Sequence, residues 1–179
     1  ANSDGFGKEP VPGFEKVLRE PGEDGIGEYL ICDVKQPGAI VRLWTARING
    51  TIRLYIDNTD TPYFEGNAED FFWQAPEALT GKTFSEGTLR QFDAVYFPIP
   101  FAERLRIEWI GDLQKLHFYH VGLRLYDNST KVESFSKKQV EACGTNLEAI
   151  TTRLQQTNTP DMIGKDNNQF IIPSRNNKV

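Results

Sequence analysis

Residues 38–57, GAIVRLWTARINGTIRLYID, decide the fold. Two runs rich in β-branched and aromatic residues flank Asn49-Gly50, the dipeptide most typical of a two-residue type I′ hairpin loop. Because a two-residue loop sets the register, the pattern predicts that Trp44 lies opposite Tyr55. The stretch therefore predicts an antiparallel hairpin with strands at 39–47 and 51–57.

The predicted hairpin has two faces, because alternate residues of a strand point to opposite sides. The core face is expected to hold Val41, Leu43, Thr45, Ile52, Leu54 and Ile56. The other face is expected to hold Ile40, Arg42, Trp44, Ala46, Arg53, Tyr55 and Asp57, with Arg42 opposite Asp57. Since a plain solvent face needs no such mixture of aromatic and charged residues, we expect a loop, a second domain, another subunit or a ligand to cover it.

Short apolar runs separated by Gly and Pro turns predict further strands. These are expected near 14–18 and at 28–34, 89–98, 104–111, 116–126 and 131–135, with a short helix at 68–73. Alternation at 104–111 places Leu105, Ile107 and Trp109 on one face of their strand.

Two capping-box patterns, Ser136-x-x-Gln139 and Thr145-x-x-Glu148, predict helices after residue 136. Gly144 between them suits a helix C-cap. The second helix is expected to turn one side inward, with Leu147, Ile150 and Leu154.

This order of elements indicates an all-β fold, an antiparallel β-sandwich of jelly-roll type with one or two short C-terminal helices. The sequence predicts three parts. They are a jelly-roll β-sandwich at 1–135, a short helical extension at 136–156, and a linker or tail at 157–179.

The bulk composition is that of an ordinary globular chain of 179 residues with a net charge of −5 and a pI near 5.1. No Lys/Arg cluster favours nucleic acid or a membrane surface as partner, and no apolar run is long enough to span a bilayer. Cys32 is expected to be a buried apolar thiol, and Cys143 lies near a predicted helix end. The first ten residues are not a signal peptide; a mature terminus and a trimmed start both remain open, with a secreted or periplasmic location favoured over the cytoplasm.

Several strings together resemble glycoside hydrolase family 172, long catalogued as a domain of unknown function. They are QPGAIVRLWTARINGTIRLYID at 36–57, YFPIPFAERLRI at 96–107, FYHVGLRLY at 118–126 and VESF at 132–135, with NSDGFG at 2–7 similar to an NDDWG-type stretch. The resemblance implies a jelly-roll fold, two such rolls per protomer, and trimers or higher oligomers. It also implies action on furanosides, including difructose anhydrides and arabinofuranosides.

The resemblance places the family's catalytic glutamates in a later segment, in motifs like WWGEGDE and GTGTEDYF. Neither string occurs here, so the chain is expected to be the first roll only and no catalytic residue is assigned. A glycosidase needs two carboxylates, about 5–5.5 Å or about 6.5–9.5 Å apart. No spacing singles out a pair among Asp4, Asp24, Asp33, Asp57, Glu65, Glu69, Asp70 and Glu108.

The candidate substrate-binding residues are Asn2, Asp4, Trp44, Tyr55 and Arg42. Asn2 and Asp4 lie in a polar, Gly-flanked segment that the resemblance places near the family's sugar pocket. Trp44 and Tyr55 could stack on a sugar ring or form a covered cross-strand pair. Arg42 could bind a ligand or simply pair with Asp57, which would lower the pKa of Asp57 and make it a poor general acid.

Metal and cofactor sites are not indicated. The two histidines, His117 and His120, are three apart on a predicted strand and so point to opposite faces, which prevents both from binding one metal. No cofactor is expected. The apolar stretch 96–101, YFPIPF, fits a sheet edge, where it could form an interface or a loop folded onto the end of the sandwich.

Three functions remain open from the sequence. The first is the N-terminal roll of a family 172-like glycoside hydrolase, which shapes the pocket and builds a homo-oligomer beside a second jelly-roll segment. The second is a stand-alone carbohydrate-binding module, with Trp44, Tyr55 and Trp109 as candidate platforms. The third is a purely structural oligomerisation domain.

Overall fold

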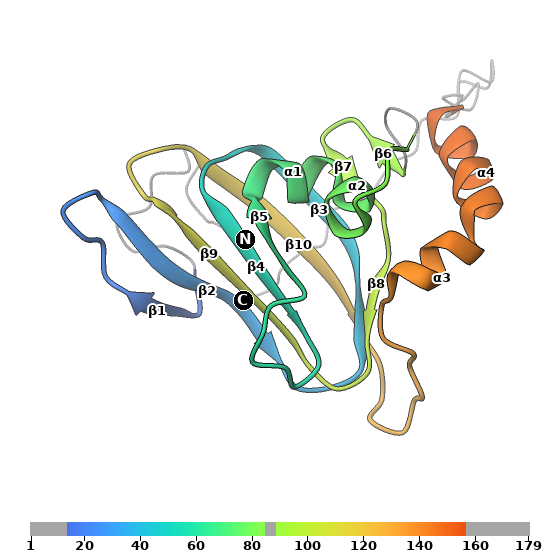
Figure 1. The fold of residues 1–179 in the computed structure, drawn as a ribbon, viewed down its shortest axis with the longest axis horizontal. Helices are drawn as coiled ribbons and strands as arrows, with labels where there is room; N and C mark the ends of the chain where they lie inside the picture. The colour runs from blue at the N-terminus through green and yellow to red at the C-terminus, as the bar shows by residue number, and fades with distance from the viewer. Residues whose placement is uncertain (1–13, 85–88, 157–179) are drawn as a thin grey trace, which may run out of the picture.

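The strands form two antiparallel sheets that pack face to face (Figure 1). The structure, a computed structural model, describes residues 14–84 and 89–156. Sheet A has the order β1-β2-β9-β4-β5, and sheet B has the order β10-β3-β7-β6, with β8 also paired to β3. The predicted antiparallel β-sandwich is therefore confirmed.

The bounds of the strands and helices follow the chain. Sheet A contains β1 (Lys16–Arg19), β2 (Ile26–Val34), β4 (Thr51–Ile56), β5 (Phe64–Asn67) and β9 (Leu105–Asp112). Sheet B contains β3 (Gly38–Ile48), β6 (Arg90–Gln91), β7 (Ala94–Val95), β8 (Ile99–Phe101) and β10 (His117–Leu125). The helices are α1 (Ala68–Trp73), α2 (Ala75–Thr80), α3 (Lys137–Ala142) and α4 (Gly144–Gln155).

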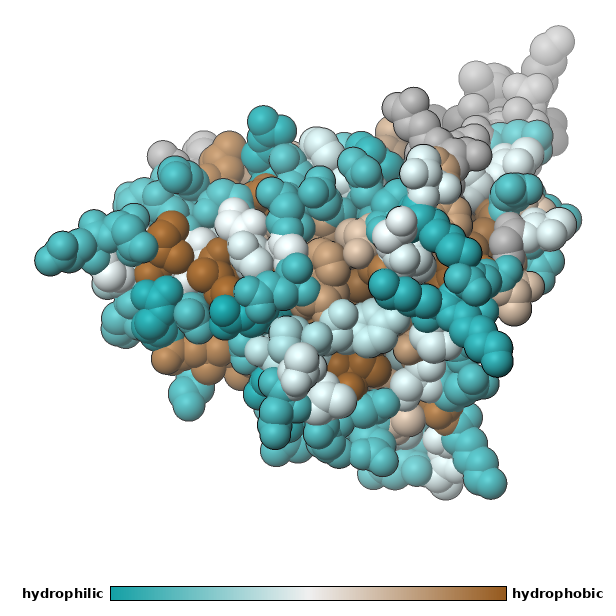
Figure 2. Space-filling view, in the orientation of Figure 1, coloured by the Kyte–Doolittle hydropathy of each residue, from teal (hydrophilic) through white to brown (hydrophobic). Residues whose placement is uncertain are grey.

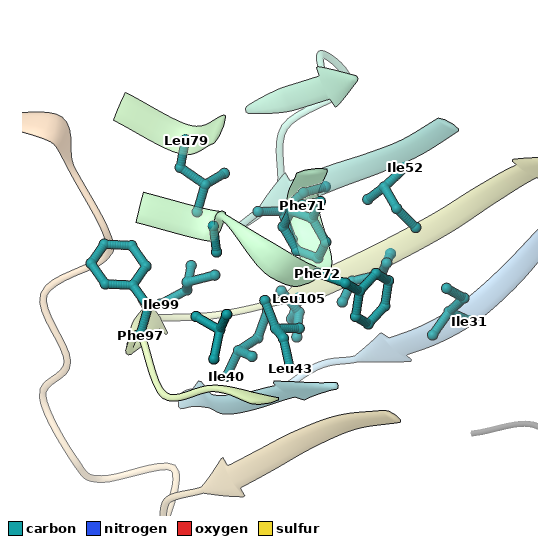
Figure 3. Close-up of a cluster of buried hydrophobic side chains, with 14 of the residues drawn as sticks. Ile31, Ile40, Leu43, Ile52, Phe71, Phe72, Leu79, Phe97, Ile99 and Leu105 are labelled. Carbon is teal, nitrogen blue, oxygen red and sulfur yellow. The ribbon is translucent and has the colours of Figure 1, made fainter. Parts of the chain in front are cut away.

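The chain passes from sheet A to sheet B between β2 and β3, and returns to sheet A between β3 and β4. It changes sheet again between β8 and β9, and between β9 and β10. Such alternation between two packed sheets is typical of the jelly-roll type of sandwich, although the predicted 39–57 hairpin did not anticipate it. Side chains from both sheets and from α1 and α2 meet in one core (Figure 3). The core includes Ile31, Ile40, Leu43, Ile52, Phe71, Phe72, Leu79, Phe97, Ile99 and Leu105.

The predicted hairpin between 39–47 and 51–57 is wrong. Strand β3 pairs with β10, β7 and β8, whereas β4 pairs with β9 and β5, so the two strands lie in opposite sheets. Of the dipeptide, only Gly50 has a positive φ, 84°, whereas a type I′ turn requires two such residues. Asn49-Gly50 is therefore a crossing between sheets.

The side chain of Asn49 explains this crossing. Its amide nitrogen donates to the carbonyl oxygens of Asp112 (3.1 Å) and Leu116 (3.0 Å), and its amide oxygen accepts from the backbone N–H of Asp112 (3.0 Å). In addition, the indole N–H of Trp109 donates to the Asn49 carbonyl at 2.6 Å. These hydrogen bonds hold the loop after β3 against the end of β9 and the β9–β10 connection, so the chain does not turn back to pair β4 with β3.

The predicted faces need one correction on β3. Ile40 is fully buried and Val41 is 37% exposed, the reverse of the prediction. Gly122 pairs with Arg42 and the next residue, Leu123, pairs with Ile40, so Val41 is the extra residue of a β-bulge. The bulge reverses the alternation, while the other predicted core residues, Leu43, Thr45, Ile52, Leu54 and Ile56, are buried.

Asp57 does not pair with Arg42. Its carboxylate accepts hydrogen bonds from the backbone N–H groups of Ala102 and Glu103, both at 2.9 Å, and from the Ser134 hydroxyl at 2.6 Å. The pairing failed because it depended on the hairpin register. Asp57 instead ties the end of β4 to the loop after β8.

The helices were partly predicted. Helix α1 has the predicted bounds and is capped by the Asn67 side chain, which accepts from the Asp70 N–H; α2 was not predicted. The capping box of Ser136 and Gln139 is confirmed. The Thr145 box is wrong, because α4 begins at Gly144 without a side-chain cap, so Gly144 is not a C-cap.

Two strand predictions and one helix face also differ. The predicted strand at 89–98 is the short hairpin β6–β7, and 131–135 is not a strand. On α4, Leu147 is buried but Ile150 is 48% exposed. Within the described ranges, no helix is long and apolar enough to cross a membrane.

Candidate functional site

The outer face of sheet B carries an aromatic and basic cluster. Trp44 is half-buried there, and its ring meets the His120 ring edge-on with centroids 5.5 Å apart. Arg42 lies two residue pairs along β3, opposite Gly122. A Cβ on Gly122 would lie 3.2 Å from the Cβ of Arg42, so the glycine leaves room for the arginine.

The surroundings of this cluster favour the neutral form of His120. Partial desolvation lowers the pKa of His120, although its side chain is exposed, and the charge of Arg42 lowers the pKa further. A neutral imidazole can accept or donate a hydrogen bond beside the permanent charge of the guanidinium. The outer face of sheet B therefore offers an aromatic ring and two polar groups at one place.

Tyr55 lies on the outer face of sheet A, away from Trp44. Its ring is covered by the Arg106 guanidinium, 3.7 Å from the ring centroid, and its hydroxyl donates to the Glu108 carboxylate at 3.3 Å. Burial raises the pKa of Tyr55, and the charge of Glu108 adds to the effect. The structure therefore separates Tyr55 from Trp44 and Arg42, and its ligand role stays a prediction.

The acidic residues of sheet A are engaged by neighbouring cations. Arg53 contacts Glu65 (3.0 Å) and Glu28 (3.4 Å). Arg104 donates twice to Asp33, both at 2.6 Å, and this hydrogen bonding lowers the pKa of Asp33. Asp33 is therefore poorly suited to donate a proton.

The histidines lie as predicted, on opposite sides of β10. His117 is buried, with Nδ1 2.7 Å from the carbonyl oxygen of Lys115, and its ring stacks on Trp109, whereas His120 is exposed. Among residues 14–84 and 89–156, no three His, Cys, Asp or Glu side chains could hold a metal ion. Asn2 and Asp4 lie outside the described residues.

The cysteines are both free thiols. Cys32 is buried, as predicted, and burial raises its pKa to about 12. Cys143 is exposed. At pH 7 the buried thiol is therefore unreactive while the exposed one is accessible.

An apolar hollow of about 160 Å³ lies where α3 and α4 meet the edge of the sandwich. Its wall includes Phe97, Pro98, Pro100, Phe135, Val140 and Leu147. Cys143 also borders it. The apolar stretch 96–101 was the sequence signal for one wall of this hollow, and the other wall comes from the helices.

The fold and these outer faces define a β-sandwich domain with an aromatic and basic cluster on the outer face of sheet B. Residues 1–143 match the first β-sandwich domain of glycoside hydrolase family 172 (GH172). The match covers most of the chain, which belongs to this family, as the resemblance predicted. None of the curated proteins matches the chain.

Proposed function

We propose that this domain serves a GH172 glycoside hydrolase acting on furanosides, with fructofuranoside or arabinofuranoside linkages. In this proposal the domain shapes the substrate pocket and contributes to the oligomer interface, and the catalytic acids come from a second β-sandwich segment. The observation that carries the proposal is the match over residues 1–143 to the first domain of the family.

The carboxylates support this division of labour. Asp33 is held by Arg104, Asp57 accepts three hydrogen bonds, and Glu108 lies against Tyr55 and Arg106. Glu69 is paired with Arg47 at 3.1 Å. A general acid needs a pKa raised toward the working pH, whereas the hydrogen bonds from Arg104 lower the pKa of Asp33.

The first test is hydrolysis by the isolated chain. We expect these 179 residues to release no sugar from aryl arabinofuranosides or difructose anhydrides, and activity to appear only when a second segment bearing a WWGEGDE-type motif is supplied. The second segment alone is the control. Hydrolysis by the isolated chain that Glu108→Gln abolishes would show instead that this domain carries its own catalytic acid.

A second candidate function is sugar binding by the chain itself. It is favoured by the Trp44 ring, half-buried beside His120 and Arg42 on the outer face of sheet B. An aromatic face suits the apolar C–H surface of a sugar, and the guanidinium can donate to its hydroxyls.

Trp44→Ala is expected to weaken saturable binding of a furanose oligosaccharide at least about tenfold, because stacking and buried apolar area are both lost. Isothermal titration calorimetry measures the effect. Tyr55→Phe is the matched control, since the ring and its cover by Arg106 persist, and binding should be unchanged. Equal losses in the two variants, or none in Trp44→Ala, would argue against this surface.

A further inference from the structure

Phe92 is the most exposed large apolar side chain in the described part of the chain, at 86%. It lies with Asp93 in the two-residue connection between β6 and β7. Its φ is 52°, a left-handed conformation that is a genuine outlier for a bulky residue. An exposed aromatic ring is therefore held on a strained backbone at this turn.

Contacts on both sides hold this turn in place. The Arg90 side chain donates to the Phe92 carbonyl at 2.8 Å, and its guanidinium lies 5.0 Å from the centre of the Trp73 ring. The Trp73 indole in turn donates to the Thr45 carbonyl at 3.1 Å, and the Thr45 N–H donates to the Asp93 carbonyl at 3.4 Å. These contacts fix the backbone of the turn that carries Phe92. A fixed backbone lowers the entropic cost of a binding event in which the Phe92 ring is the anchor.

The same chain carries a hollow of suitable size. The apolar hollow beside α3 and α4 measures about 160 Å³. An engineered cavity of about 150 Å³ lined by Leu, Ile and Phe holds a benzene molecule. The hollow can therefore take a phenyl ring, and its walls of Phe97, Phe135 and Leu147 are chemically matched to one. Figure 2 shows one face of the molecule, on which brown apolar side chains lie among teal polar ones.

The charges beside the two features are also complementary. Asp93, next to Phe92, is exposed. On the first turn of α3, which supplies part of the wall, Lys137 and Lys138 are exposed and no acidic residue is present. A Phe92-Asp93 turn that entered the hollow would bring a carboxylate toward these ammonium groups.

We propose that Phe92 of one copy inserts into the apolar hollow of a second copy, with Asp93 facing Lys137 and Lys138. The contact joins two different surfaces, so each copy keeps one free ring and one free hollow, and repetition leads to a closed ring or a chain of copies. This inference rests on the oligomer interface proposed above and names the residues that form it.

The test measures molar mass in solution by sedimentation for the full chain and four variants. The wild-type chain is expected to self-associate. Phe92→Ala and Phe92→Gly should weaken association at least about tenfold, as loss of a buried aromatic anchor does. Leu116→Ala removes another exposed apolar side chain, 42% exposed, from the β9–β10 connection and should leave the mass unchanged.

The fourth variant, Cys143→Trp, blocks the hollow at its border and should also stop self-association. Maleimide labelling of Cys143 in the wild-type chain does the same without a mutation, because Cys32 is buried. Phe92→Ala keeps its hollow and Cys143→Trp keeps its Phe92, so an equimolar mixture should form a one-to-one heterodimer and nothing larger.

The outcomes separate this inference from the function proposed above. A wild-type chain that stays monomeric at high concentration overturns both the inference and the proposed oligomer role. If the wild type assembles and Phe92→Ala and Phe92→Gly assemble equally well, the oligomer role stands and the Phe92 contact is overturned. A folded mixture of the two variants that remains monomeric also overturns it.

Discussion

Gly50→Ala is expected to lower the free energy of unfolding by about 3 kcal/mol or more, through left-handed backbone strain and overpacking. The φ of Gly50 is 84°. A Cβ there would lie 2.1 Å from the Ile110 carbonyl oxygen and 2.9 Å from the Cα of Gly111, both backbone atoms that cannot swing away. Urea unfolding followed by circular dichroism measures the loss.

Gly81→Ala is the matched control for this prediction. Gly81 has a similar φ, 72°, as the C-cap of α2, and a Cβ there would meet nothing within 4 Å. Gly81→Ala should lower the free energy of unfolding by only about 1 kcal/mol, which is the cost of the backbone strain alone. Equal losses in the two variants would mean that the close approach of β9 to Gly50 contributes nothing.

Asn49→Ala is expected to lower the free energy of unfolding by about 2–4 kcal/mol, because three hydrogen bonds are lost, two of them partly buried, and the backbone groups of Asp112 and Leu116 are left without this partner. Asn49→Asp should cost a similar amount, since it keeps the acceptor for the Asp112 N–H but turns a carboxylate oxygen toward two carbonyl oxygens. The same urea titration measures both variants.

An exposed asparagine provides the control. The amide of Asn58 donates to the Glu103 carboxylate at 2.6 Å in an exposed position, so Asn58→Ala should change stability by no more than about 0.5 kcal/mol. If Asn49→Ala were equally mild, the clamp between the Asn49 loop and the β9–β10 connection would be of no energetic importance.

The sandwich could be predicted from the sequence because its strands carry a local signal. Alternation at 104–111 placed Leu105, Ile107 and Trp109 on one face, and all three are fully buried, so Trp109 cannot be the sugar platform that the sequence also suggested. The pairing of strands could not be predicted in the same way. The Asn-Gly signal describes a local turn, but the bonds of the Asn49 side chain reach residues 63 and 67 positions away.

The same limit applied to the candidate site. Trp44 and Arg42 share a face as predicted, because both lie on one strand, with the Val41 bulge beyond them. Tyr55 was assigned to that face only through the hairpin register, and it lies in the other sheet. The apolar hollow joins Phe97, Phe135 and Leu147, which no short-range pattern connects.

The crossing at Asn49-Gly50 also bears on how the polypeptide is made. Because the strand after this crossing goes to the other sheet, β2 and β3 find their main partners late in the chain: Ile26 pairs with Asp112, and Gly38 pairs with Leu125. During synthesis from the N-terminus, these early strands leave the ribosome without the neighbours they need. Their apolar faces stay unburied until β9 and β10 emerge, a delay typical of folds with distant pairing, and one in which chaperones protect the nascent chain.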